Sequence, residues 1–209
     1  MYLPRHFAED DPAVLHALMG RYGFALLVTT VDGEPFANHL PLLHRPEGGE
    51  FGVLLGHMAR PNPQWRGFTD GAPALAVFQG PHAYVSPSWY ASDEAVPTWN
   101  YTAVHAYGTP RVVDDHGATL AILERFVAVH EKGRPEPWSL DQVTAEFRDR
   151  QIRGIVAFEM PIDRIEGKFK LSQNKSTADR EGATVGLRAT GEALAAEVAG
   201  MMEEADGGG

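Results

Sequence analysis

The chain has 209 residues, the length of one domain or of one domain with an appendage. It contains no cysteine, which excludes disulfides, thiolate-bound metals, iron–sulfur clusters and cysteine nucleophiles. Its 28 acidic residues against 18 basic ones give a formal net charge of -10, and this charge disfavours non-specific binding to nucleic acid.

The sequence shows no targeting or membrane-spanning segment. The longest apolar runs, residues 24–28 and 74–78, have five residues each, whereas a spanning helix needs about 20. The first seven residues contain no apolar core of a signal peptide. We therefore expect a cytoplasmic protein with no membrane partner.

Charge is unevenly distributed along the chain. Residues 190–209 contain five acidic side chains and no basic one, so they carry half of the net charge. Residues 150–188 contain eight basic side chains against five acidic ones. An acidic protein therefore includes one locally basic stretch.

The first predicted elements are a helix and a hairpin. Asp11-Pro12 is a typical helix start, and apolar residues at helical spacing follow it up to Gly20. The Asp32-Gly33 pair then predicts a tight turn between strands at 24–30 and 35–43.

The rest of the chain has mostly the pattern of short strands separated by glycine and proline. Strands are predicted at 51–56, 74–79 (ended by Gly80-Pro81), 83–87, 99–113 with a bend at 108–110, 154–160 and 162–169. Helices are predicted at 117–130, from a capping-box pattern at 139–142 to about 150, and at about 191–205, before a frayed acidic and glycine-rich end at 209. Seven or eight strands without a βαβ rhythm predict one domain: a mainly β, small antiparallel barrel of the Greek-key type with peripheral helices.

The first segment with chemistry of its own is residues 56–65, which follow a predicted strand. Its imidazole, guanidinium and amide groups, with the free N–H groups of a turn, suit a phosphate. The alternative is a connection stiffened by Pro61 and Pro63 over a buried tryptophan, and the residues alone leave both open.

Two aromatic segments, residues 86–90 and 96–101, flank a loop rich in serine, aspartate and proline. They contain two tryptophans, two tyrosines and an asparagine. Aromatic rings with polar tips suit a flat, partly polar ligand, although an ordinary aromatic core layer has the same composition.

The third segment is residues 166–175. Lys168 and Lys170 alternate with apolar residues, so a strand would place both ammonium groups on one face. Hydroxyl and amide groups of residues 172–174 follow them. The segment suits a phosphate or a ring edge, and a solvated strand face is the alternative.

Nine histidines raise the question of a metal. None forms an i, i+4 pair with acidic support, so no metal site is predicted. Haem needs only one axial histidine and stays open, with His39, His57 or His105 as the ligand. The sequence contains no nucleophile elbow, dinucleotide loop or GK[ST] phosphate loop.

Five blocks of residues, in this order along the chain, resemble one known family. They are Tyr2-Leu3-Pro4-x-His6-Phe7, Gly56-His57-x-Ala59-x-x-Asn62-Pro63-x-Trp65, Tyr84-x-Ser86-Pro87-Ser88-Trp89-Tyr90, Val96-Pro97-Thr98-Trp99-Asn100-Tyr101 and Lys168-Phe169-Lys170-Leu171-Ser172-Gln173-Asn174. The sequence resembles the PaiB-type FMN-binding negative transcriptional regulators over nearly the whole chain. The resemblance implies an FMN-binding split β-barrel, related to pyridoxamine-phosphate oxidases, that forms a homodimer with FMN at the subunit interface.

The same resemblance implies a set of cofactor-binding residues. The phosphate is expected beside the second and third strands and the turn after the third, at Asn38, His39, His57, Ala59, Arg60 and Asn62. The partner subunit is expected to bring Gln79, Ser86, Trp99 or Asn100 toward the flavin ring, with Lys168, Lys170, Gln173 and Asn174 nearby. The basic stretch at 150–188 would then offset a phosphate dianion. The related oxidases place more basic and hydroxyl groups at this turn, where the chain has one arginine and an Asn-Pro pair.

Three functions follow from these observations. The first is an FMN-binding split barrel that acts as a negative transcriptional regulator, although no helix combines a basic face with a helix-turn-helix pattern. The second is a flavin-dependent oxidoreductase acting on a small molecule, with His57 and Tyr101 as candidate acid–base groups and no catalytic residue assigned. The third is haem binding or haem breakdown.

Overall fold

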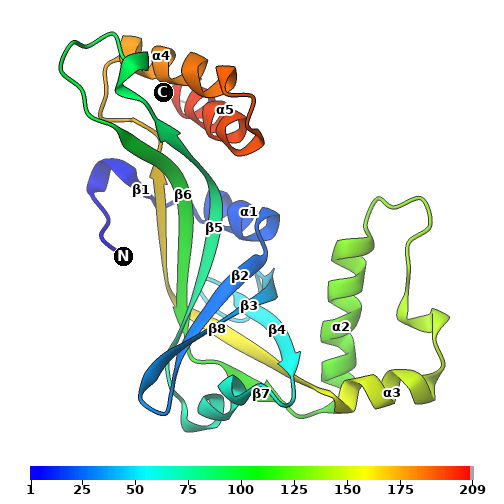
Figure 1. Cartoon of the computed structure of the whole chain (residues 1–209). Coiled ribbons are helices and arrows are strands. Elements are labelled where there is room, and N and C mark those ends of the chain that lie inside the picture. Colours follow the sequence, from blue (N-terminus) through cyan, green and yellow to red (C-terminus); the bar gives the residue numbers. More distant parts are fainter. Residues whose placement is uncertain (208–209) are drawn as a thin grey trace. The chain divides into compact units, whose positions relative to one another are not determined.

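The computed structural model describes residues 1–207, and its main element is an antiparallel sheet (Figure 1). The strands in these residues are β1 (Ala8–Glu9), β2 (Phe24–Val31), β3 (Glu34–Arg45), β4 (Val53–Ala59), β5 (Ala74–Val85), β6 (Thr98–Gly108), β7 (Arg111–Val113) and β8 (Ile155–Lys170). Their hydrogen-bonded order is β1-β8-β4-β3-β2-β5-β6, with β7 and β6 also paired to β8. The predicted antiparallel, mainly β class is confirmed.

Helices and short 3-10 turns connect the strands. The α-helices are α1 (Pro12–Arg21), α2 (His116–Glu131), α3 (Ala145–Arg153), α4 (Thr177–Ala189) and α5 (Ala193–Gly207). The 3-10 segments are η1 (Arg5–Phe7), η2 (Pro63–Asp70), η3 (Pro87–Trp89) and η4 (Leu140–Gln142). No helix of residues 1–207 is both long enough and apolar enough to cross a membrane. The last two residues of the predicted frayed end, 208 and 209, lie outside the described part.

The β2–β3 hairpin forms where the sequence predicts it. Asp32 and Gly33 both have positive φ, at 52° and 83°, which is the requirement of a two-residue type I′ turn. The register pairs Val31 with Glu34 directly across this turn. Asp and Gly adopt this conformation at little cost, so the local sequence alone is sufficient to start the hairpin.

Two predicted strands, 74–79 and 83–87, are one continuous strand, β5. The prediction of a break at Gly80-Pro81 was wrong. A Cβ on Gly80 would lie 2.1 Å from Oγ1 of Thr102, so the glycine allows a close approach of side chain to backbone. Glycine inside a strand can mark either a break or a close approach of a neighbouring group, and Gly80 marks a close approach.

The strands predicted at 154–160 and 162–169 are likewise one strand, β8. Pro161 was expected to separate them, and this was also wrong. Pro161 lies opposite Val53, the last pair of the β4–β8 ladder, and the N–H of Ile162 donates to the carbonyl of Gly52 at 3.0 Å. The missing proline N–H falls where the ladder with β4 ends, so the strand continues.

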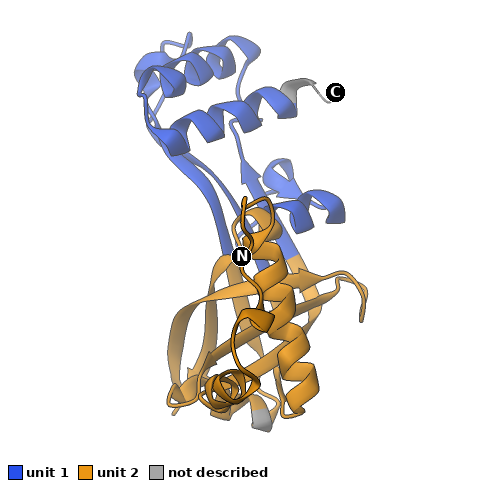
Figure 2. Cartoon of the chain, turned by 90° about the vertical axis from the view of Figure 1, so that its right-hand side faces the viewer, with its two compact units in different colours: residues 1–18, 78–105, 166–209 blue, residues 19–77, 106–165 orange. Residues whose placement is uncertain are grey.

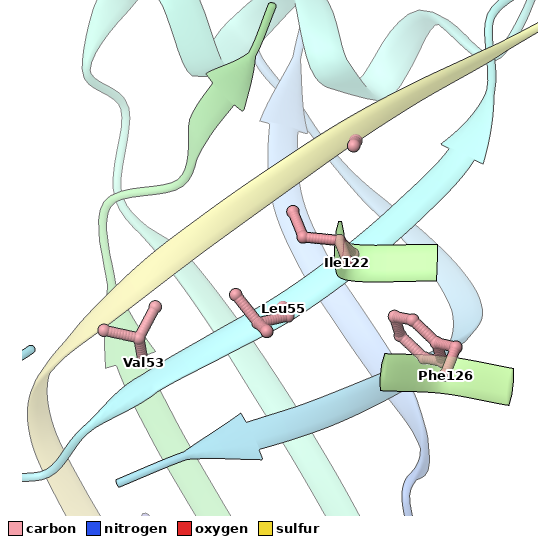
Figure 3. Close-up of a cluster of buried hydrophobic side chains, with 5 residues drawn as sticks. Val53, Leu55, Ile122 and Phe126 are labelled. Atoms are coloured by element: carbon pink, nitrogen blue, oxygen red, sulfur yellow. The ribbon is translucent and has the colours of Figure 1, made fainter. Parts of the chain in front are cut away.

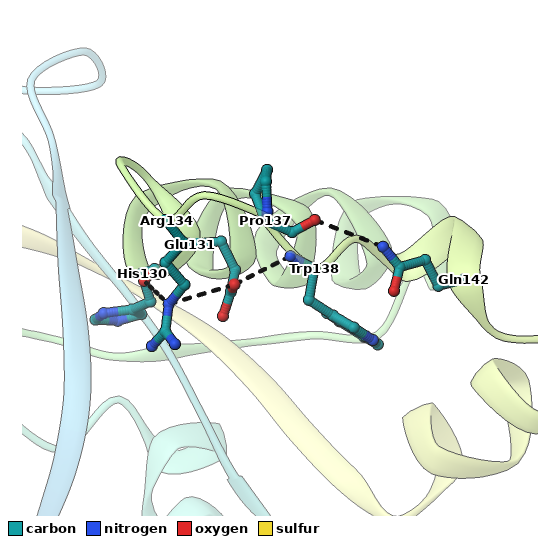
Figure 4. Close-up of polar contacts among 6 residues, drawn as sticks. All are labelled: His130, Glu131, Arg134, Pro137, Trp138 and Gln142. Atoms are coloured by element: carbon teal, nitrogen blue, oxygen red, sulfur yellow. Dashed lines mark hydrogen bonds and ion pairs between the residues drawn. The ribbon is translucent and has the colours of Figure 1, made fainter.

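Helix α3 begins later than the capping-box pattern predicts. Ser139 makes no side-chain capping bond and precedes only the short η4 segment, whereas Oγ1 of Thr144 accepts from the N–H of Phe147 at 3.2 Å and caps α3. The connection between α2 and α3 is bound to the end of α2 (Figure 4). The carboxylate of Glu131 accepts from the backbone N–H of Trp138 at 3.0 Å and lies 3.3 Å from the guanidinium of Arg134.

Backbone contacts divide the chain into two compact units (Figure 2). Unit 1 consists of residues 1–18, 78–105 and 166–209, and unit 2 of residues 19–77 and 106–165. Strands β5, β6 and β8 each contribute residues to both units.

The core of unit 2 includes a cluster where α2 covers β4 and β8. Five side chains of this cluster are nearly inaccessible to solvent: Val53 and Leu55 of β4, Ile122 and Phe126 of α2, and Ala157 of β8 (Figure 3). Apolar side chains of this size contribute roughly 1.5–3 kcal/mol each when fully buried. This cluster therefore stabilises the strand that leads into the polar segment at 56–65.

The core of unit 1 includes a close contact between α4 and Trp89 of η3. A Cβ on Gly186 would lie 2.2 Å from Cδ2 of the indole, and one on Gly182 would lie 2.0 Å from the carbonyl of Trp89. Two glycines lower helix propensity, which is why the sequence does not predict α4. Its N-terminus is capped by Oγ of Ser176, which accepts from the N–H of Asp179.

Candidate functional site

In unit 2, the predicted site residues lie on two neighbouring strands and on the turn into η2. Asn38, on β3, donates from Nδ2 to Oε1 of Gln64 at 2.8 Å. Gln64 is completely buried, and its Nε2 donates to the carbonyl of Leu27 at 2.9 Å and to Oγ1 of Thr29 at 3.1 Å. This network holds the Asn38 amide in one orientation, and sequence reasoning missed Gln64 altogether.

Asn62 starts η2. Its Oδ1 accepts from the N–H of Gln64 at 3.0 Å, and Pro63 occupies the first position of the helical turn. An Asn cap followed by proline is a sequence-encoded start, so this local geometry is the expected one. The side chain of Asn62 therefore orders the backbone of the turn, and through Gln64 it is connected to Asn38.

His57 and Ala59 lie on β4, opposite Ala157 and Ile155 of β8. The imidazole of His57 packs edge-on against Phe126 at 5.3 Å, and its buried Nδ1 has no hydrogen-bond partner in the described residues. Burial lowers the pKa of this imidazole below 6.5, so the ring is neutral near pH 7. Ala59 is exposed at the end of the strand.

Arg60 follows β4 directly and binds the end of α3. Its Nε donates to the carbonyl of Arg153 at 2.8 Å and its Nη2 to the carbonyl of Ile155 at 2.6 Å. A cation at a helix C-terminus is favourable, and this contact uses two of the five guanidinium donors. The carbonyl of Arg60 in turn accepts from the indole N–H of Trp65 at 2.9 Å.

A pocket of about 290 Å³ opens beside Arg60. Trp65, His116, Arg153 and the acidic Asp114 also line it, together with Thr119 and apolar residues of β7, α3 and β8. The two guanidinium groups are donors suited to an anion. The imidazole of His116 pairs with the carboxylate of Asp149 at 3.1 Å. Arg153 and His116 are far from Arg60 in sequence, and the only signal for Arg153 was its place in the basic stretch.

His39 is separate from this group of residues. It is exposed on β3, where its ring stacks on Phe24 of β2 at 5.9 Å. Among the residues that the structure describes, no group of three or more histidine, aspartate or glutamate side chains could hold a metal ion.

In unit 1, Gln79 lies on β5 and Trp99 lies on β6, and both side chains are near His82 of β5. Gln79 is exposed and contacts Nδ1 of His82 at 3.3 Å. Trp99 is 55% exposed, and its ring lies 6.2 Å from His82 and 6.1 Å from Tyr84. His82, Tyr84 and Trp99 form a partly exposed aromatic face, and of these three residues only Trp99 belongs to the segments 86–90 and 96–101.

Ser86 and Asn100 have internal roles. Oγ of Ser86 accepts from the N–H of Ser88 at 3.2 Å and caps η3. Asn100 is completely buried: its Nδ2 donates to Oγ of Ser172 at 2.9 Å and its Oδ1 accepts from the same hydroxyl at 3.2 Å. Both amide atoms of Asn100 are therefore used inside unit 1.

The lysines at the end of β8 are surrounded by aromatic rings and carbonyl groups. Nζ of Lys168 donates to the carbonyl of Tyr2 at 3.0 Å and lies 5.4 Å from the ring centres of Tyr2 and Tyr101. Nζ of Lys170 lies 2.5 Å from Oγ1 of Thr98 and from the carbonyl of Trp99. Burial and the like charges of Lys168 and then Lys175 lower the pKa of Lys170.

The last two predicted residues follow these lysines. Gln173 makes both of its hydrogen bonds to nearby backbone, from Nε2 to the carbonyl of Phe169 at 2.5 Å and at Oε1 from the N–H of Leu171 at 2.8 Å. Asn174 is exposed. The structure thus brings Lys168 and Lys170 together, while Gln173 shapes the turn after the strand.

Two solved structures share this architecture. The "FAD and Heme binding protein from Mycobacterium smegmatis" aligns with a TM-score of 0.63 and 18% identity over 84% of this chain and 79% of that one. The "Flavocytochrome Anf3 from Azotobacter vinelandii" aligns with a TM-score of 0.63 and 15% identity over 80% of this chain and 72% of that one. The fold is therefore the split barrel of flavin-binding proteins.

Sequence comparison defines the family more narrowly. "Protease synthase and sporulation protein PAI 2" of Bacillus subtilis (strain 168) is 36% identical over 207 residues, covering 98% of this chain and 97% of that protein. The "Uncharacterized protein AN0679" of Emericella nidulans is 29% identical over 98% of this chain and 97% of its own length. The family described as "Putative FMN-binding domain" matches residues 1–164, so this chain belongs to it, and FMN is the cofactor that the family assigns.

The residues of unit 2 fit this cofactor. His57 has a buried Nδ1 with no hydrogen-bond partner in the described residues, and such atoms are rare in proteins unless a ligand or water completes them. The pocket beside Arg60 adds cationic groups for a phosphate. Both features lie within the part of the chain that the family covers.

Proposed function

We propose that this chain binds FMN non-covalently and that, with FMN bound, it is an oxidoreductase acting on a small molecule. The observation that carries the binding half is the pocket beside Arg60, where Arg153 and His116 also line the wall. Arg60 retains donors beyond the two that bind the carbonyls of Arg153 and Ile155, so it can contact a phosphate while keeping both bonds.

The residues of unit 2 have distinct tasks in the proposal. Arg60 and Arg153 attract the phosphate dianion, and the network of Asn38, Gln64 and Asn62 keeps the turn rigid. His57, neutral near pH 7, offers Nδ1 as one hydrogen-bonding atom. Bound FMN supplies two-electron exchange, and the protein supplies binding and orientation.

The proposal also includes a second subunit. The resemblance to homodimeric split barrels, together with the exposed aromatic face, supports a role for Gln79, Ser86 and Trp99 beside the flavin ring of a partner copy. Asn100 is left out because both of its amide atoms are already bound in the core. Size-exclusion chromatography with light scattering tests the dimer, and Trp99→Ala is expected to weaken FMN binding while the chain stays folded.

The test of the phosphate site compares FMN with riboflavin. Flavin fluorescence titration of the desalted protein is expected to show tighter binding of FMN. Arg153→Gln should reduce FMN affinity about tenfold, the loss of one charged hydrogen bond, and leave riboflavin affinity unchanged. Arg134→Gln, an exposed arginine of the same unit, is the matched control. A desalted protein that takes up no FMN would contradict the proposal.

Two further measurements separate the functions. The absorbance spectrum distinguishes flavin from haem, which matters because two proteins of this fold carry haem or flavocytochrome in their names. Anaerobic bleaching of the bound flavin by NADH or NADPH supports the oxidoreductase. A flavin that stays oxidised with several reductants contradicts it.

A second candidate is negative transcriptional regulation. The name of the 36% identical Bacillus relative, which refers to protease synthesis and sporulation, favours it. Helices α4 and α5 are separated by only a short turn, as in helix-turn-helix motifs. However, α5 carries no lysine or arginine, and Arg188 of α4 pairs with Glu203 of α5. Salt-sensitive retention of the chain's own promoter DNA would support direct repression, and its absence would exclude it.

A further inference from the structure

The end of β8 concentrates the lysines of this protein. The sequence contains four lysines against fourteen arginines, and three of the four lie between residues 168 and 175. Lys168 is only 8% exposed, and Lys170 is half-buried two residues further on the same strand. Lysine side chains are almost never buried without a partner, so this placement requires an explanation.

The groups that the ammonium of Lys168 contacts directly are neutral. Its ammonium donates to the carbonyl of Tyr2 and lies over the rings of Tyr2 and Tyr101. These contacts offset part of the cost of burial through the negative faces of the rings. They leave the positive charge itself uncompensated.

The groups that Lys170 contacts directly are neutral as well, and the nearby charges of Lys168 and Lys175 have the same sign as its own. It donates to the hydroxyl of Thr98 and the carbonyl of Trp99, and the ring of Phe7 lies 5.7 Å away. Glu166, the nearest acidic residue along β8, binds the amino group of Met1. Among the described residues, neither lysine forms an ion pair with a carboxylate.

Two ammonium groups on one strand, neither paired with a carboxylate, therefore repel each other. Buried charges in proteins are paired or bind a ligand, and one anion between the two groups would satisfy both. Burial, and after it the like charges of Lys168 and Lys175, lower the pKa of Lys170.

We propose that Lys168 and Lys170 together bind the carboxylate or phosphate of a small organic ligand other than FMN. The two ammonium groups lack a carboxylate partner whether or not a flavin is bound elsewhere. The exclusion of FMN rests on the proposed function, which places the phosphate of FMN beside Arg60. With that function, the anion identifies the substrate class: small molecules that carry a carboxylate or a phosphate monoester.

The low lysine content makes a direct test practical. A chain labelled with [13C]lysine has only four side-chain Cε signals, which single Lys→Arg variants assign. Exposed Lys132 serves as the internal control. Benzoate and phenyl phosphate are the anionic probes, benzyl alcohol is the neutral one, and FMN and riboflavin test the cofactor.

Both anionic probes should shift the Lys168 and Lys170 signals in a saturable way, whereas Lys132 should not respond. Benzyl alcohol and riboflavin should leave all four signals unchanged. Lys170→Gln should weaken benzoate binding about tenfold, as expected for one charged hydrogen bond, and Lys132→Gln should have no effect. Lys170→Arg keeps the charge and should keep most of the affinity, which separates loss of charge from loss of folding.

Two results would overturn the inference. If neither anion produces a saturable shift, there is no anion site at these lysines. If FMN but not riboflavin shifts both lysine signals and displaces benzoate, the lysines bind the phosphate of the cofactor instead. A failure of the proposed function is distinguishable, because FMN would then fail to bind in the fluorescence titration while benzoate still shifted the lysine signals.

Discussion

Gln64 offers a sharp test of how the polar turn in unit 2 is held. Replacement by leucine keeps most of the volume but removes the donors to the carbonyl of Leu27 and to Oγ1 of Thr29, and the acceptor of Asn38. The site is completely buried, so water cannot replace the lost groups without entering the core. Gln64→Leu is therefore expected to destabilise the fold much more than an average polar substitution.

The magnitude follows from the number of groups left without a partner. An NH₂ group has two hydrogens, so the contacts at 2.9 and 3.1 Å count as its two bonds, and a third at 3.3 Å to the carbonyl of Phe36 adds little. A buried acceptor that loses its donor costs about 1–3 kcal/mol, and half-exposed Asn38 can turn to water. We expect a loss of about 2–4 kcal/mol in the free energy of unfolding.

Urea unfolding followed by tryptophan fluorescence measures this loss as a shift of the midpoint at constant slope. Gln79→Leu is the matched control, because Gln79 is exposed and makes one long contact with a histidine. The control should change stability by less than about 0.5 kcal/mol. A loss below about 1 kcal/mol for Gln64→Leu, or equal losses in both variants, would refute the reasoning.

Three further predictions use the same unfolding assay. Gly186→Ala should lower the free energy of unfolding by about 1–3 kcal/mol, because the added Cβ would collide with the indole ring of Trp89. Gly200→Ala should raise it by about 1 kcal/mol, because no atom lies within 4 Å of the added Cβ. Equal effects of the two substitutions would contradict the packing of α4 on Trp89. Thr144→Ala should cost about 1 kcal/mol through loss of the α3 cap, and Ser139→Ala should cost almost nothing; the reverse order would restore the capping box as the helix start. Burial lowers the pKa of His57 in the folded chain, so the unfolded chain binds more protons and stability falls as pH drops below about 6.5. His57→Gln should reduce this loss of stability at low pH. An unchanged pH profile of stability would contradict burial of the imidazole as the cause of the loss.

Much of the fold could be predicted because its signals are local. The Asp32-Gly33 turn and the Asp11-Pro12 helix start depend on backbone preferences of adjacent residues. The errors arose where glycine or proline has a tertiary role. Gly80 lies inside a continuous strand, where it leaves room for the side chain of Thr102. Pro161 lies inside a continuous strand where the ladder with β4 ends.

The candidate site was predictable only in part. The segment after β4 was identified by its residue types, and a pocket lies beside it. The task of each side chain was not predictable, because it depends on a partner far along the chain. Arg60 contacts a carbonyl 93 residues away, and Asn100 bonds to a hydroxyl 72 residues away.

Length, composition and charge excluded thiol chemistry and disfavoured a nucleic-acid surface, and the motif blocks pointed to a flavin-binding split barrel. The net charge of -10 did not reveal that one buried and one half-buried ammonium group lie side by side on a strand without a carboxylate partner. That arrangement exists because the N-terminal segment covers Lys168, which donates to a carbonyl 166 residues away. Composition determines which charges a chain carries, and only tertiary contacts decide which of them lose water and need a ligand.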